Sequence, residues 1–250
     1  MPFHLLAYAS SSLDASAGNV QLPAVADPIF NRSNSNYQIP VEHWLMFAYL
    51  GGVGMTKGRF QAGSLQQRGY PQIAPFSILA IPPSNAQIMD MRDYPLALRR
   101  EEDLRVSITN GAANPAICLA AVSNERPNYN VNNKDLRIIR GTASVTAAAY
   151  AWSTQGSFSP EDTLEGGSYD VYGLAIQGAA VLGGRIIFQG QNYRPGCLGQ
   201  AAASDKQNQL FWGGLGYFGT FNTYSLPQIE TIETGAGAST PNVLLLCGKR

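Results

Sequence analysis

The stretch LGGVGMTKGRFQAGSLQQRGYP, residues Leu50–Pro71, decides how this chain is interpreted, because a similar stretch returns later. The second stretch, Ile176–Gly196, reads IQGAAVLGGRIIFQGQNYRPG. Identical residues recur at a constant spacing of 126 positions. The matched pairs are Gly52 with Gly178, Gly58 with Gly184, Arg59 with Arg185, and Arg68 with Arg194. This pattern indicates an internal duplication.

The same spacing returns nearer the end of each half. NGAANPAICLA begins at Asn110 and AGASTPNVLLL begins at Ala236, so that Pro115 matches Pro241. Glycine and alanine match by chance in a glycine-rich chain, but matched Arg and Pro residues at one spacing argue for duplication. The spacing is far longer than the ~20–50 residues of solenoid repeats, so we expect two domains, 1–125 and 126–250.

The composition favours an all-β fold. Hydrophobic residues make up 45% and charged residues only 14%, with 26 glycines and 15 prolines. Short apolar or alternating runs bounded by Gly, Pro, Asn or Ser predict strands, and Asn110-Gly111 after one of them predicts a turn. Each half has room for about eight strands with their connections, so we expect two tandem eight-stranded jelly rolls. A seven-stranded immunoglobulin-like sandwich remains an alternative. The expected strands lie at 43–51, 58–65, 76–83, 86–92, 104–110 and 116–122, then at 136–153, 169–181, 184–190, 210–221, 228–234 and 242–247.

The glycines of the repeated stretch do not form a phosphate loop. Such a loop needs Gly-x4-Gly-Lys-Ser/Thr between a strand and a helix, whereas here Lys57 precedes Gly58 and no helical pattern follows. The spacing of Gly52, Gly54 and Gly58 also departs from the dinucleotide-binding fingerprint. Glycines inside strands more often mark bulges or close backbone approach. We expect the four repeated arginines to satisfy carbonyls or carboxylates within each half, with an interface role as the second interpretation.

Candidate catalytic and metal-binding residues are few, and we expect no enzyme activity, no cofactor and no metal site. His4 and His43 are the only histidines, and no Gly-x-Ser-x-Gly elbow is present. His43, next to Trp44, is interpreted as a structural histidine at a strand start. The three cysteines have no metal-ligand spacing and are expected to be buried free thiols: Cys118, Cys197 and Cys247.

Two acidic clusters and three aromatic clusters have structural interpretations beside functional ones. Glu101-Glu102-Asp103 follows two arginines and reads as a solvated turn, and Glu161, Asp162 and Glu165 lie in a predicted loop. A glycosidase pair or a calcium site is the alternative at either place. The aromatic clusters favour core packing over a sugar-stacking platform. They are Tyr150 with Trp152, Tyr169 with Tyr172, and the run from Leu210 to Tyr224.

The charge and the termini suggest a soluble protein made in a cytosol. The formal net charge is zero, which disfavours nucleic-acid binding. The first residues carry no basic leader region, and no run approaches the ~18–20 apolar residues of a membrane span. The polar, proline-punctuated segment from Ser10 to Pro40 predicts either an extended N-terminal arm or a strand with a long loop.

The duplicated halves give the chain a resemblance to a known family. The two Gly-Arg segments (58–59 and 184–185), the Asn-Pro and Thr-Pro segments (114–115 and 240–241) and the near-equal halves resemble the double-jelly-roll major capsid proteins of icosahedral, membrane-containing bacteriophages. The chain is similar to the compact capsid proteins of marine lipid-containing phages, with little room for tower loops.

The resemblance implies a homotrimer with a pseudo-sixfold outline, which serves as a tile of an icosahedral shell in the virion. It also implies that neighbouring capsomers, penton or minor capsid proteins and an internal membrane are partners. A phage decoration or receptor-binding protein, or a carbohydrate-binding sandwich, is the alternative of another class. An exposed row of aromatic residues would favour that alternative.

Overall fold

The computed structural model describes residues 3–16, 18–52, 54–69, 72–73, 76–77, 89–125, 136–200 and 216–250. Its regular structure is β-strand, apart from one 3-10 helix, η1 (Gly63–Arg68), so the described chain is all-β as expected. The described residues divide into two compact units. The N-terminal unit contains the described residues between 5 and 125, and the C-terminal unit contains those between 136 and 250 together with Phe3 and His4.

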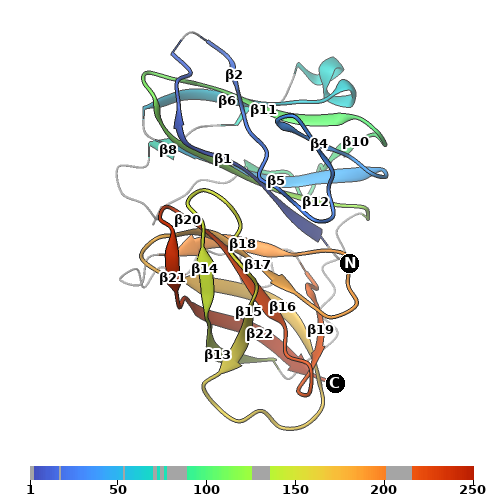
Figure 1. Ribbon diagram of the computed structural model, residues 1–250. Helices are drawn as coiled ribbons and strands as arrows, with labels where there is room; N and C mark the ends of the chain where they lie inside the picture. The colour runs from blue at the N-terminus through green and yellow to red at the C-terminus, as the bar shows by residue number, and fades with distance from the viewer. Residues whose placement is uncertain are drawn as a thin grey trace. The chain divides into compact units, whose positions relative to one another are not determined.

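The N-terminal unit consists of two sheets around one core (Figure 1). The first sheet has the order β1-β12-β5-β10, with β8 and β9 also pairing with β5. The second has the order β3-β4-β11-β6-β7, with β2 also pairing with β11. The strands are β1 (Phe3–Leu13), β2 (Val20–Leu22), β3 (Arg32–Ser33), β4 (Asn36–Gln38), β5 (His43–Gly52), β6 (Met55–Gln61), β7 (Gln72–Ile73), β8 (Phe76–Ser77), β9 (Met89–Asp90), β10 (Leu96–Leu98), β11 (Asp103–Asn110) and β12 (Asn114–Ser123).

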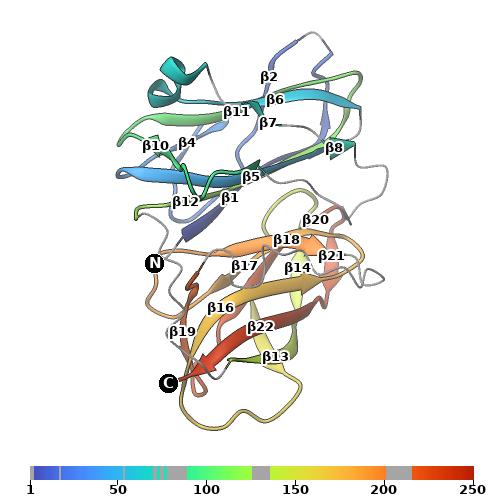
Figure 2. The same cartoon turned by 180° about the vertical axis from the view of Figure 1, so that it is seen from behind.

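The C-terminal unit is built from eight strands in the order β18-β17-β20-β15-β13-β22-β16-β19, with β18 also pairing with β16. Figure 2 shows β22 between β13 and β16. A separate ribbon joins β14 to β21. The strands are β13 (Leu136–Ala143), β14 (Val145–Ala147), β15 (Gly156–Pro160), β16 (Ser168–Gln177), β17 (Val181–Ile187), β18 (Gly196–Gln200), β19 (Gly219–Asn222), β20 (Gln228–Glu233), β21 (Gly237–Ser239) and β22 (Asn242–Lys249).

The two units share one strand order. In the N-terminal unit β1, β4, β5, β6, β7, β10, β11 and β12 serve as strands one to eight, and in the C-terminal unit β13, β15, β16, β17, β18, β19, β20 and β22 do so. In each unit strands one, eight, three and six are neighbours in that order, and so are strands two, seven, four and five. Strand one therefore pairs with the last strand of its own unit.

Two β-bulges recur at the same places in both units. Met46 has no paired residue in the ladder between β5 and β12, and Tyr172 has none in the ladder between β16 and β22. The ladder of β6 and β11 skips Thr56, and the ladder of β17 and β20 skips Leu182. Each pair of skipped residues is separated by 126 positions, the spacing of the glycine and arginine matches. A bulge inserts one unpaired residue and bends its strand, so its position is a specific feature of a fold.

The spacing is not constant along the whole unit, which corrects part of the sequence alignment. Gly51 pairs with Ile117, whereas Gln177, 126 positions after Gly51, pairs with Asn242. Equivalent residues of the last strands, β12 and β22, are therefore 125 positions apart. Pro115 and Pro241, which are 126 positions apart, miss equivalent positions by one residue. A one-residue slip moves a side chain to the other face of a sheet, so the proline match does not mark equivalent positions.

Several predicted elements differ from those observed. The segment after Ser10 is not an extended arm, because it contains the end of β1 and all of β2, β3 and β4, and buries Phe30 and Tyr37 in the core. The strand predicted to Leu65 ends at Gln61, where η1 follows, and the strand predicted to Ser153 is interrupted after Ala143 and ends with β14. Three predicted strands, at 76–83, 86–92 and 210–221, lie partly outside the described residues, at 78–83, 86–88 and 210–215. Their described parts contain β8, β9 and most of β19. Strand β1 was not predicted at all.

Candidate functional site: the repeated glycine and arginine positions

The repeated glycines leave space for a side chain that faces them. A Cβ atom at Gly58 would overlap the side chain of Leu50, and one at Gly184 would overlap the side chain of Ile176. Leu50 and Ile176 are themselves 126 positions apart, and both are fully buried. The two glycines therefore permit the same contact between strands three and four in each unit.

The second glycine pair follows the same rule. A Cβ atom at Gly52 would overlap the Met55 side chain, and one at Gly178 would lie 2.8 Å from Cγ2 of Val181. Met55 and Val181 are again 126 positions apart and are buried. The glycines thus permit close approach of a facing side chain, whereas the sequence predicted bulges or close approach of backbone at glycines inside strands.

Arg185 lies at the centre of a buried ion cluster in the C-terminal unit. Its side chain is only 1% exposed, and its Nε donates to Oε2 of Glu230 at 2.5 Å. Arg194 donates from Nη1 to the other oxygen of Glu230 at 2.6 Å. The guanidinium of Arg185 also lies 4.0 Å from the ring centroid of Trp152. Nδ1 of His4 accepts a hydrogen bond from the backbone N–H of Arg194 at 3.1 Å.

This cluster holds chain segments together rather than offering a reactive group. Glu230 on β20 links β17 to the segment 188–195, and the His4 ring ties the start of β1 to the same segment. Arginine keeps its proton in proteins, so neither guanidinium serves as an acid or base. A carboxylate that accepts charge-assisted hydrogen bonds from two arginines is strongly oriented.

The corresponding arginine of the N-terminal unit has a different cross-strand neighbour. Arg59 pairs across the ladder with Ser107, as Arg185 pairs with Glu230. Its Nε donates to the Ser107 hydroxyl at 3.3 Å, and its side chain is half-buried. Arg68 ends η1, and its side chain lies outside the described residues.

Sequence reasoning missed a second polar cluster, around Asp170 on β16. Its carboxylate accepts from the Thr220 hydroxyl at 2.5 Å and from Nε of Arg250 at 2.9 Å. The hydrogen bond to Asp170 raises the pKa of the Arg250 guanidinium. The signal for this cluster was the single charged residue in the apolar run of β16, YDVYGLAI.

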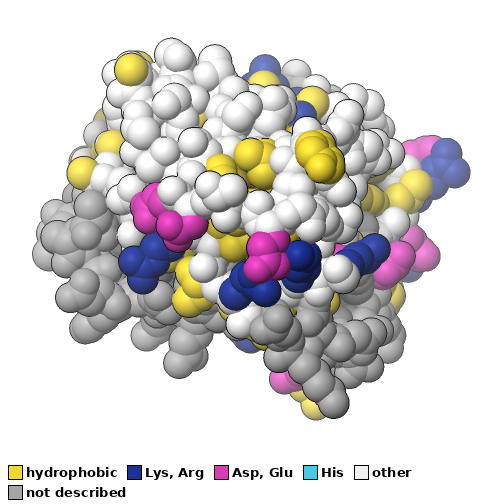
Figure 3. Space-filling model, turned by 90° about the horizontal axis from the view of Figure 1, so that it is seen from below, with side chains coloured by type: hydrophobic (Ala, Val, Ile, Leu, Met, Phe, Trp, Pro, Cys, Tyr) yellow, Lys and Arg dark blue, Asp and Glu magenta, His cyan; other side chains and the backbone are white. Residues whose placement is uncertain are grey.

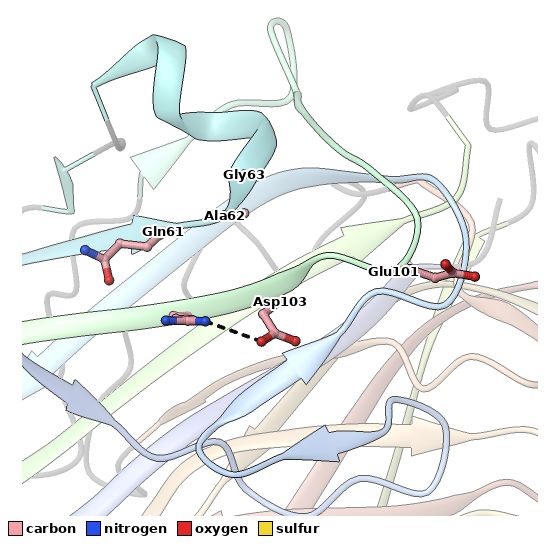
Figure 4. A pocket seen from close by; sticks show the side chains of 6 residues that line it. Gln61, Ala62, Gly63, Glu101 and Asp103 are labelled. Atoms are coloured by element: carbon pink, nitrogen blue, oxygen red, sulfur yellow. Dashed lines mark hydrogen bonds and ion pairs between the residues drawn. The ribbon is translucent and has the colours of Figure 1, made fainter.

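The first acidic cluster borders a surface hollow of about 480 Å³, shown in Figure 4. Within it Oδ2 of Asp103 lies 3.4 Å from Nη2 of Arg105, and Glu101 pairs with Arg100 at 3.0 Å. Glu102 instead accepts from the backbone N–H of Ser64 at 2.8 Å, at the start of η1. Each carboxylate thus already has a local partner. Among the residues that the structure describes, no three His, Cys, Asp or Glu side chains are grouped as metal ligands would be.

The remaining candidate residues are packed. His43 is 1% exposed at the start of β5, and burial lowers its pKa. The ring of Tyr169 stacks on Phe221 at 5.4 Å between centroids, while Tyr224 is 94% exposed. The three cysteines are free and buried as expected, and burial raises the pKa of each thiol. No helix among the described residues has the length and apolar character that crossing a membrane requires.

Comparisons with known proteins give little further information. No family model matches the chain, and no curated protein matches it. Among solved structures it is similar to the major capsid protein P2 from bacteriophage PM2, at 11% sequence identity. The match covers 99% of this chain and 98% of that protein, with a TM-score of 0.24. A likeness at this score and identity has no weight for the fold or function of this chain.

Proposed function

We propose that the chain is a double jelly roll that arose by internal duplication, with domains that correspond to 1–125 and 126–250. The shared strand order supports this proposal, since a jelly roll has eight antiparallel strands in two sheets. The bulges at matched positions support the duplication independently of residue identity. Two unrelated sandwiches have no physical reason to share both bulge positions and the same glycine contacts.

We further propose that the protein is a viral structural protein, a major capsid protein whose homotrimers form the tiles of an icosahedral shell. The observation that carries this proposal is the presence of two equivalent units in one chain. Three such chains around one axis present six similar units, and a nearly hexagonal tile packs edge to edge over a closed lattice. Arg185, one of the residues that match between the two halves, forms an ion pair with Glu230 inside its own unit. An internal contact of this kind fits a structural protein, whose role depends on a rigid shape.

The proposed partners follow from this role. They are other copies of the chain in the trimer and in neighbouring tiles, together with penton or minor capsid proteins and an internal membrane. The location is then the virion, after synthesis in a host cytoplasm. A net charge of zero fits a tile that rests on its neighbours better than one that gathers nucleic acid. The carbohydrate-binding alternative has less support, because the aromatic rings of Tyr169, Phe218 and Phe221 are buried.

The absolute mass of the purified protein tests the capsid proposal. Light scattering coupled to size exclusion should give three times the chain mass of 26.8 kDa, or shell-sized particles visible by electron microscopy. A chain that stays monomeric up to millimolar concentration would contradict the capsid role. Glycan-array screening would then test the alternative.

A further inference from the structure

The outward face of β13 and β22 carries an apolar surface. Ile138 is 50% exposed and Leu136 is 40% exposed, although both lie within a regular strand. Ile138 pairs across the ladder with Leu246, and Leu244 on the same side of β22 is also only half-buried. The residues that alternate with these along the two strands are buried and face the core: Ile139, Val243, Leu245 and Cys247. We call Leu136, Ile138, Leu244 and Leu246 the β13–β22 patch.

The corresponding face of the N-terminal unit is apolar and fully buried. Strands three and eight of that unit, β5 and β12, carry Phe47, Tyr49, Ile117 and Leu119 on the side opposite the core, each at most 2% exposed. Those strands read as continuous apolar runs, the pattern of strands buried on both faces. Apolar residues on the side of this sheet that lies opposite the core are thus a feature of both units.

The border of the β13–β22 patch carries charges of both signs. A hollow of about 210 Å³ beside β13 is lined by Arg137, Arg140, Asp162 and Glu165 among other residues. Lys249 binds Glu165 at 2.8 Å close by. Figure 3 views the molecule from below and shows acidic and basic side chains next to one another, with apolar side chains between them. A partner with a surface of a single sign would be repelled by part of this border.

We propose that the β13–β22 patch binds the same patch of a second copy of this chain, around a two-fold axis. A second copy brings an equal apolar surface and a border with the same mixture of charges, so neither sign dominates the border on either side of the contact. The chain as a whole carries no net charge, so two copies approach without repulsion. The inference rests on the proposed function, because a shell needs contacts between tiles as well as contacts within them.

Ile138→Glu tests this contact, with Val41→Glu as the matched control. Val41 is 46% exposed, close to Ile138, but lies in the N-terminal unit. Sedimentation over a range of concentrations should show that Ile138→Glu needs at least a tenfold higher protein concentration to form assemblies larger than the trimer. Val41→Glu should form them at the same concentration as the unchanged chain. Ile138→Ser, a milder change, should shift association in the same direction if the charged variant folds poorly. Circular dichroism confirms that each variant is folded.

The outcomes separate this inference from the capsid proposal. If the unchanged chain forms trimers or shells and both Ile138 variants associate equally well, the patch contact is wrong and the capsid role stands. If Val41→Glu weakens association as much as Ile138→Glu does, the added negative charge explains the loss wherever it is placed. The proposed patch contact is then also wrong. If the unchanged chain is monomeric at every concentration, both proposals fail.

Discussion

Arg59 and Arg185 occupy equivalent positions on strand four of the two units, yet their surroundings differ. Arg185 is buried between Glu230 and the ring of Trp152, whereas Arg59 is half-buried and donates to the hydroxyl of Ser107. The strand order, bulges and glycine contacts are shared, whereas the residue across the ladder from the arginine differs: Ser107 in one unit and Glu230 in the other. The two units thus have equivalent strands but different side-chain contacts at this position.

The largest effect should come from removing the carboxylate that only the C-terminal unit has. Glu230→Gln removes the negative charge that pairs with the buried guanidinium of Arg185 and should lower the free energy of unfolding by about 3–5 kcal/mol. Ser107→Ala at the equivalent position should cost about 1 kcal/mol or less, because it removes one long hydrogen bond. Guanidinium unfolding followed by tryptophan fluorescence measures both. Equal costs for the two variants would show that the ion cluster does not distinguish the units.

An intermediate effect is expected at the glycines, where the units should behave alike. Gly58→Ala and Gly184→Ala should each cost about 1–3 kcal/mol, because the added methyl group overlaps a buried side chain. Combining them with Leu50→Ala and Ile176→Ala, respectively, should recover part of that cost. A double-mutant cycle in each unit should therefore show coupling of about 1 kcal/mol. Coupling in one unit only would break the structural equivalence.

The smallest effect is a pH dependence that one unit contributes. Burial lowers the pKa of His43, so below about pH 6.5 the unfolded chain binds a proton more readily than the folded chain does. Stability should therefore decrease as pH falls from 7.5 to 5.5. Position 169, equivalent to His43, carries a tyrosine, so the C-terminal unit has no matching group. Melting midpoints of His43→Gln should vary less over this range, and an unchanged slope would assign the pH dependence to other groups.

The sequence predicted what local patterns determine. Continuous apolar runs such as HWLMFAYLG gave strands close to their observed limits, and the strands predicted at 58–65 and 184–190 overlap β6 and β17 in part. Contacts that depend on register could not be predicted, because no local signal marks a bulge at Thr56 or Leu182. Glu230 was missed as the partner of Arg185 for this reason, although the run QIETIE was expected to be a strand.

The contact of His4 with Arg194 has a consequence for the order in which the chain acquires its structure. Their hydrogen bond joins residues that are 190 positions apart, within the C-terminal unit. During synthesis His4 leaves the ribosome long before its partner exists, while the strands of the N-terminal unit are completed first. Contacts over such a separation form slowly because a long loop must close. The hydrogen bond between His4 and Arg194 should therefore be among the last contacts that the C-terminal unit forms.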